Sequence, residues 1–140
     1  MLAQFVLIIR QLHGMRTIAL LMSFVFWGAV SVSAQSVSEV VTALKQANAD
    51  KVTDNFDSVI DLKMPEKAEL KSIGKTQASV VLSSFFDQSK ITGFEMGSQR
   101  ELASTVYITG KLQSTEKTYN ITIMLKTKGD KQQIITVRIG

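Results

Sequence analysis

The sequence predicts an α+β fold in which N-terminal helices pack on a strongly curved antiparallel sheet. Apolar residues recur at helical spacing in the first half of the chain and alternate at strand spacing after Ser89. The turn signal Lys128-Gly129-Asp130 separates the last two alternating segments, as in an antiparallel hairpin. Helices that come first and a meander of strands that comes last are typical of an α+β domain with its helices on one face of the sheet.

The first 34 residues are typical of a signal peptide. Arg16 precedes an uncharged apolar run over residues 18–30, and small residues follow as far as Ala34. We therefore predict cleavage after Ala34, which leaves a single domain over residues 35–140. The protein is then exported, to the periplasm or to the outside of the cell.

The start of this segment and its removal each have an alternative. Residues 2–9 form a second apolar stretch ahead of Arg10, so Met15 is predicted as the true start in place of Met1. An uncleaved anchor is the alternative to cleavage, because residues 17–38 carry no charge and are long enough to cross a bilayer. Serine and glycine within that run favour cleavage, after which no stable membrane span is expected.

A capping box predicts where the first helix of the domain begins. Ser36 and Glu39 stand three residues apart, as the two members of such a box do. Apolar residues follow at helical spacing: Val37, Val40, Val41 and Leu44. The helix is therefore expected to start at Ser36, two residues after the cut, which also favours cleavage. A second, short helix is expected over residues 50–56.

The clearest helix covers residues 74–88. Its apolar face consists of Ala78, Val81, Leu82, Phe85 and Phe86. Phe85 and Phe86 are adjacent, so both cannot sit at the centre of one narrow stripe. One of them is expected to reach toward a pocket or a subunit partner, although packing in the core is the simpler interpretation of both.

Alternating apolar residues predict the strands. The expected strands cover residues 60–64, 91–96, 106–112, 119–125 and 135–139. Pro65 ends the first of them because it cannot donate to a ladder of hydrogen bonds. Residues 66–73 are ambiguous, and an edge strand is one interpretation of them.

Composition excludes several chemistries. The chain has no cysteine, and its one histidine, His13, and its one tryptophan, Trp27, precede the predicted cut. A disulfide framework, a thiol nucleophile, a lipid anchor on cysteine and a Ser-His-Asp arrangement are therefore excluded from the domain. The formal net charge of +4 falls to +2 once Arg10 and Arg16 are removed. We therefore expect no nucleic-acid binding, which requires a concentrated basic stripe.

Carboxylates and tyrosines are the main groups left for chemistry. One dense acidic run is present, formed by Asp50, Asp54, Asp57 and Asp61. Its spacing of four, three and four does not match the alternating ligands and central glycine of a calcium loop, so a solvated helix face is predicted and no metal site.

Three residues are candidates for a pocket with polar chemistry. Asp61 lies between apolar residues of a strand, where a carboxylate that faces a pocket could act as a base, although an outward position is the simpler interpretation. Tyr107 and Tyr119 could donate hydrogen bonds to a ligand carbonyl. An isomerase-like reaction would need one aspartate and one tyrosine to converge.

Capping, core and turn positions carry a resemblance to a known family. They are residues 36–41 with Leu44, Phe56-Asp57, residues 75–78 with Leu82, Phe85 and Phe86, and residues 123–126 leading into 128–131. The domain resembles the bacterial secreted family called domain of unknown function 4783, of the nuclear transport factor 2-like (cystatin-like) superfamily. The resemblance implies a cone of helices over a bent sheet that encloses a pocket or a dimer surface. It implies no catalytic residue, because none of these stretches is a catalytic signature.

Three functions remain open at this stage. The first is a non-catalytic module that binds an unknown small molecule or an envelope protein in a pocket or on the sheet face. The second is a structural or assembly partner at the cell envelope, with a homodimer through the sheet face as one form. The third is a small enzyme that uses aspartate and tyrosine. Binding is favoured because few catalytic groups are left, and we expect no cofactor.

Overall fold

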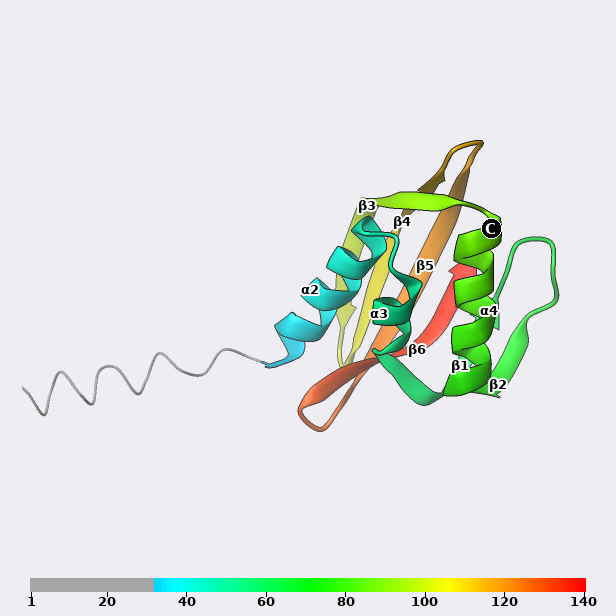
Figure 1. Ribbon diagram of the computed structural model, residues 1–140. Coiled ribbons are helices and arrows are strands. Elements are labelled where there is room, and N and C mark those ends of the chain that lie inside the picture. Colours follow the sequence, from blue (N-terminus) through cyan, green and yellow to red (C-terminus); the bar gives the residue numbers. More distant parts are fainter. Residues whose placement is uncertain (1–31) are drawn as a thin grey trace, which may run out of the picture. The chain divides into compact units, whose positions relative to one another are not determined.

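Three helices and six strands make up residues 32–140, the part of the chain that the computed structural model describes (Figure 1). In chain order they are α2 (Val32–Lys45), α3 (Ala49–Thr53), β1 (Phe56–Lys63), β2 (Leu70–Gly74), α4 (Lys75–Gln88), β3 (Ile91–Leu102), β4 (Thr105–Ser114), β5 (Thr118–Lys128) and β6 (Lys131–Ile139). The predicted signal segment lies outside the described residues except for positions 32–34. No helix in this part of the chain is both long and apolar enough to cross a membrane.

The first described helix begins earlier than the capping box indicates. α2 starts at Val32, so Ser36 lies inside the helix and the expected start at Ser36 is wrong. Neither glycine nor proline occurs between these positions, so nothing in the backbone stops the helix from continuing across Ala34. Gln35 Nε2 donates to the Glu39 carboxylate at 3.3 Å, and Glu39 therefore has a local partner without acting in a cap.

A residue in the left-handed backbone conformation follows α2, and an N-cap residue starts α3. Ala47 has a φ of 53°, and Asn48 then caps α3 by accepting a hydrogen bond from the Lys51 N–H at 3.1 Å. The short helix was expected to reach Phe56, but it ends three residues earlier and Phe56 begins β1. Phe56 pairs with Ile134 of β6, so sheet pairing outweighs the helical spacing of its side chain.

The strands form one sheet in the order β2-β1-β6-β5-β4-β3. Neighbouring strands are antiparallel except β1 and β6, which run parallel and are joined by the long connection that a parallel pair requires. The predicted hairpin is confirmed, because Lys128 pairs with Lys131 around Gly129, whose φ is 61°. The ambiguous stretch over residues 66–73 contains an edge strand only in its second half, where β2 begins at Leu70.

Irregular pairing bends the sheet and decides which side chains face the core. A register shift between β5 and β6 turns Ile134 inward instead of Ile135, contrary to the alternation expected from the sequence. The register between β3 and β4 also shifts after Met96. Near that point Phe94 packs so closely over Gly110 of β4 that a Cβ at Gly110 would overlap its ring.

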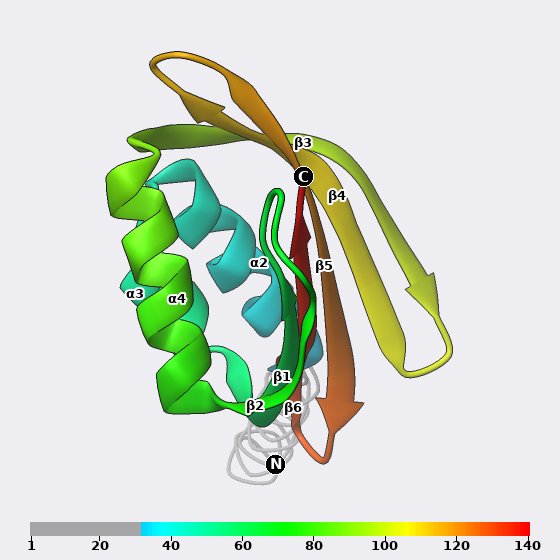
Figure 2. The ribbon, with the colours of Figure 1, turned by 90° about the vertical axis from the view of Figure 1, so that its right-hand side faces the viewer.

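The three helices lie on the same face of the curved sheet, as Figure 2 shows. The largest fully buried side chains come from both layers: Val40, Leu44, Phe56, Ile60, Leu62, Leu82, Ile108, Leu112, Ile123, Leu125, Ile134 and Ile139. Residues 32–140 form a compact unit, whose core of buried apolar residues extends from Val37 to Ile139. The predicted fold class is therefore confirmed.

The acidic run was predicted to form a solvated helix face, and this prediction is wrong for two of its members. Asp57 and Asp61 lie on β1, and Asp57 is only 8% exposed. Lys128 of β5 forms an ion pair with the Asp57 carboxylate, and the Ser58 N–H donates to Oδ1 of Asp57 at 2.7 Å. The hydrogen bond from Lys128 is the main cause that holds the pKa of Asp57 below its ordinary value of 3.8, against the effect of burial.

Replacement of Asp57 by asparagine tests this ion pair. Because the pKa of Asp57 is lowered in the folded state, its carboxylate stabilises the fold above the ordinary value of 3.8 and loses that effect as pH falls below it. We expect Asp57→Asn to lower the free energy of unfolding by about 1–2 kcal/mol at pH 7 and by less at about pH 2.5, measured by urea unfolding. The exposed Asp54→Asn is the control, and an equal loss at both pH values for Asp57→Asn would contradict the ion pair.

Candidate functional site

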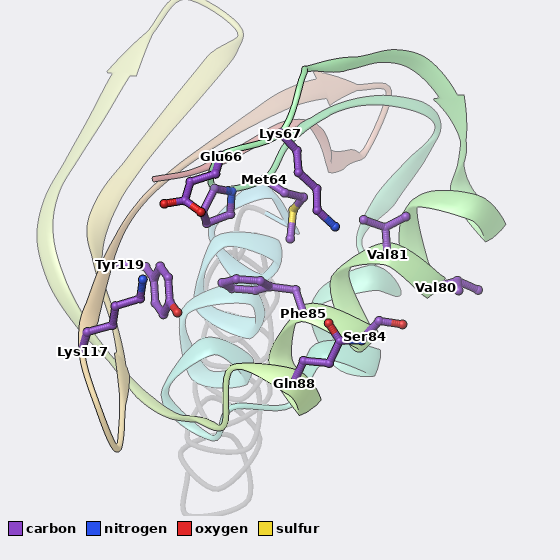
Figure 3. A pocket seen from close by; sticks show the side chains of 11 residues that line it. Met64, Glu66, Lys67, Val80, Val81, Ser84, Phe85, Gln88, Lys117 and Tyr119 are labelled. Atoms are coloured by element: carbon purple, nitrogen blue, oxygen red, sulfur yellow. The ribbon is translucent and has the colours of Figure 1, made fainter.

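A pocket of about 380 Å³ lies between α4, the loop after β1 and the hairpin that joins β4 to β5 (Figure 3). Its lining residues are Met64, Pro65, Glu66 and Lys67 of the loop, Val80, Val81, Ser84, Phe85 and Gln88 of α4, and Lys117 and Tyr119 of the hairpin. This volume falls within the range of small-molecule sites. The pocket is therefore large enough to hold a ligand.

The wall formed by α4 follows from the helical period. Leu82 and Phe86 are buried in the core, together with Ala78 one turn earlier. Successive residues of a helix point about 100° apart, so Val81 and Phe85 face away from the centre of the core. Both are half-buried and line the pocket.

The loop wall is a tight turn. The Lys67 N–H donates to the Met64 carbonyl at 3.3 Å, with Pro65 and Glu66 as the two central residues. Glu66 has a φ of 60°, which suits the third residue of a type II turn but strains a residue other than glycine. Lys63 Nζ donates to the carbonyls of Met64 and Lys67 and so holds the turn in place.

The hairpin wall is organised by Ser114. The Ser114 hydroxyl donates to the Lys117 carbonyl at 2.7 Å and accepts from the Lys117 N–H at 3.1 Å. This double contact fixes the backbone of Lys117. Its Nζ lies 4.8 Å from the centre of the Tyr119 ring, in a cation–π contact.

Two aromatic rings meet inside the pocket. The centres of the Phe85 and Tyr119 rings are 5.1 Å apart at an interplanar angle of 79°, an edge-to-face arrangement. Met64, which is 5% exposed, and Val81 extend this apolar surface. The pocket therefore offers a limited apolar patch within a lining that is otherwise mostly polar.

Charged side chains surround this apolar surface. Figure 3 shows Lys67 reaching from the loop toward α4, while Glu66 and Lys117 lie on the side of Tyr119. Among residues 32–140, the two ion pairs that form involve other residues, so these three charges have no ion-pair partner there. Ser84 and Gln88 of α4 add polar groups at the rim.

The structure brings two of the five candidate pocket residues together. Phe85 and Tyr119 both line the pocket and touch each other. Phe86 is 4% exposed and belongs to the core, although its ring stands 6.3 Å from that of Phe85. The two phenylalanines thus have different roles, and Phe85 is the one that reaches the pocket.

Asp61 and Tyr107 lie elsewhere. Both project from the outer face of the sheet, which is the face opposite the helices, and neither lines this pocket. Asp61 accepts a hydrogen bond from the Ser72 N–H at 2.7 Å and so ties the edge strand β2 to β1. Tyr107 pairs with Met124, Met124 with Thr136 and Thr136 with Asp61. Three strand spacings, roughly 14 Å, therefore separate the two side chains.

Sequence reasoning missed the charged residues of the pocket. Lys67 and Lys117 are exposed lysines in turns, where lysine is common for reasons of solubility alone. The signals that accompany them are local. Pro65 marks the turn that carries Lys67, and Lys117 stands two residues before Tyr119. Neither signal indicates that the two turns face the same helix.

Comparison with known proteins identifies the family. The family model described as Domain of unknown function (DUF4783) matches residues 37–140. The chain belongs to the DUF4783 family. No curated protein matches it.

Solved structures agree with this assignment. The DUF4783 chain is similar to a family member from Bacteroides uniformis, at 20% identity and a TM-score of 0.67 over 73% of this chain and 93% of the other. It is similar to an uncharacterized cystatin fold protein from Novosphingobium aromaticivorans, at 10% identity and a TM-score of 0.56 over 76% and 95%. It is also similar to an NTF2-like protein of unknown function from Cytophaga hutchinsonii, at 12% identity and a TM-score of 0.53 over 75% and 85%. At these identities the likeness establishes the NTF2-like, cystatin-like fold.

The adjacent phenylalanines of this DUF4783 chain provide a matched pair of variants. We expect Phe86→Ala to lower the free energy of unfolding by about 3–5 kcal/mol, because it empties a filled core site. Phe85→Ala should cost about 1–2 kcal/mol, because its ring is only half-buried. Thermal and urea unfolding measure both, and equal losses would contradict the assignment of Phe85 to the pocket.

Proposed function

We propose that this DUF4783 domain is a non-catalytic binding module that holds a small molecule with an apolar body in the pocket between α4, the loop after β1 and the β4–β5 hairpin. The observation that carries the proposal is the contact between Phe85 and Tyr119. It places two aromatic rings on the wall of a hollow of about 380 Å³, outside the filled core. Apolar walls with a few polar groups at the rim are typical of ligand sites.

The alternative of an aspartate- and tyrosine-dependent enzyme has less support. Asp61 and Tyr107 are held apart by β6 and β5, and Asp61 accepts from a backbone N–H of β2. Tyr119 lines a pocket whose one carboxylate is that of Glu66 at the exposed rim. A general base needs to reach the proton that it removes, and this arrangement supplies no buried base for Tyr119 to assist.

A protein partner on the outer face is the second candidate. Tyr107 of β4 and Met124 of β5 pair on that face and are half-buried, although none of the helices in residues 32–140 covers them. A second copy of the chain or an envelope protein could cover this surface. Sedimentation of the purified domain would detect the homodimer directly. If the dimer forms through the outer face, its formation should depend on Tyr107.

A neutral apolar probe tests the pocket. We expect N-phenyl-1-naphthylamine to bind residues 32–140 at one saturable site, with the rise in probe fluorescence as the measurement. Phe85→Ala should weaken binding by about tenfold or more, which corresponds to a loss of about 1.4 kcal/mol. The matched control is Tyr107→Thr on the outer face, which should leave the affinity unchanged. Binding that depends on Tyr107 and not on Phe85 would move the site to the sheet face.

Export is part of the proposed function, because a binding module outside the cytoplasm would meet ligands from the surroundings. The support is the sequence of residues 15–34, with its positive start, apolar run and small residues before Gln35. The alternative of an anchor rests on the uncharged run over residues 17–38.

Sequencing of the amino terminus separates these alternatives. We expect protein recovered from the periplasm or the medium to begin at Gln35, because cleavage follows Ala34. Full-length protein found only in the membrane fraction would contradict export and favour the anchor.

A further inference from the structure

We propose that the pocket selects small aromatic carboxylates, with Lys67 as the residue that binds the carboxylate group. This inference rests on the proposed function and names the class of its ligand. It follows from the charges at the rim and from the apolar surface between them.

Lys67 is placed to meet an anion. Its side chain extends from the loop across the pocket toward α4, beside Met64 and Val81 (Figure 3). Its ammonium forms none of the ion pairs found among residues 32–140. The loop that carries it is fixed by the Lys63 contacts to the carbonyls of Met64 and Lys67. An ammonium beside apolar side chains attracts an anion more strongly than one fully surrounded by water.

Lys117 adds a second positive charge from the opposite wall. Its position is restricted by the Ser114 contacts to its backbone and by the Tyr119 ring beneath its ammonium. Side-chain freedom already lost in the free protein is not lost again on binding. Lys117 therefore supports an anion at longer range without a large entropic cost.

Glu66 is the one opposing charge on the lining. Two ammonium groups and one carboxylate leave the rim with a net positive charge, so an anion is favoured over an amine. Glu66 lies on the side of Tyr119 and away from Lys67 in Figure 3. It should weaken the binding of an anion slightly, and its removal should strengthen that binding.

The body of the ligand is expected to be aromatic. The Phe85 ring meets the Tyr119 ring in an edge-to-face contact, and both rings line the pocket together with Met64 and Val81. Flat rings pack well against an aromatic face, and a methionine sulfur makes favourable contacts with them. A planar group can therefore lie on Phe85 while its carboxylate meets Lys67.

Three indole compounds of similar size and different charge test the class. Indole-3-acetate is an anion, indole-3-acetamide is neutral and tryptamine is a cation. Residues 32–140 contain no tryptophan, since Trp27 is the only one in the chain. The fluorescence anisotropy of the indole, excited at the red edge of its absorption where tyrosine does not absorb, therefore reports binding without a protein background. We expect indole-3-acetate to bind about tenfold more tightly than the amide, and tryptamine to bind most weakly.

Variants locate the charge that is responsible. Lys67→Met keeps the length of the side chain and should remove most of the preference for the acid over the amide. Lys117→Met should weaken acid binding by about two- to threefold, and Glu66→Gln should strengthen it by about twofold, as expected for charges at an exposed rim. Binding of the amide should be the same in all three variants, which shows that the fold and the apolar surface are intact.

The outcomes separate this inference from the proposed function. Equal binding of acid and amide would overturn the selection of carboxylates. A preference for the acid that survives Lys67→Met would overturn the assignment of Lys67 as the residue that binds the carboxylate. The binding function would still stand if N-phenyl-1-naphthylamine bound in a manner that depends on Phe85. If neither that probe nor any indole compound bound, the proposed function and this inference would both be wrong.

Discussion

The burial of Phe86 sets the rotation of α4 about its own axis, and the pocket depends on that rotation. Phe86 and Leu82 fill the core between the helices and the curved sheet. The residue before each of them is then directed about 100° away, which places Phe85 and Val81 toward the loop and the hairpin. The apolar surface of the site is therefore a consequence of core packing. A rotation of α4 that exposed Phe86 would also remove Phe85 from the pocket.

The turns of the other two walls are held by hydrogen bonds from side chains to the backbone. Lys63 holds the turn after β1 through two carbonyl groups, and Ser114 holds the hairpin after β4 through the backbone of Lys117. Both turns are short and carry lysines. The rim is thus built from restrained segments, which limits the conformational entropy lost when a ligand binds.

The two faces of the sheet have separate tasks. The inner face packs on the helices and carries the core, while the outer face has Asp61 bonded to the backbone of β2 and Tyr107 opposite Met124. Asp57 stabilises the sheet where β5 turns toward β6, through its ion pair with Lys128. Asp61 and Tyr107, the two candidates for catalysis outside the pocket, therefore belong to the hydrogen bonding and the surface of the sheet. The NTF2-like fold by itself does not assign a function, so the pocket has to carry that conclusion.

The sequence by itself determined the fold class, α4 and the β5–β6 hairpin. The spacing of apolar residues and the residue types of a turn depend only on nearby residues, and at these places no contact with a distant segment opposed them. Apolar residues within 75–88 recur at helical spacing, and Gly129 suits the positive φ of its turn. Local patterns failed where pairing with a distant strand decided the outcome. Phe56 joined β1 because it pairs with Ile134, and Ile134 replaced Ile135 in the core because the register between β5 and β6 shifts.

The site shows the same division between local and tertiary information. The adjacency of Phe85 and Phe86 indicated that both could not lie at the centre of one narrow stripe, because successive helical residues cannot share one direction, but packing in the core was the simpler interpretation of both. The packing of α4 against the sheet decided which of the two faces the pocket and which side chains it contacts there. Lys67 and Lys117 lie fifty residues apart in sequence, and only the folded chain brings their turns to the same helix. Spacing along a chain carries no information about such a distance in space, so this part of the site was decided by tertiary structure alone.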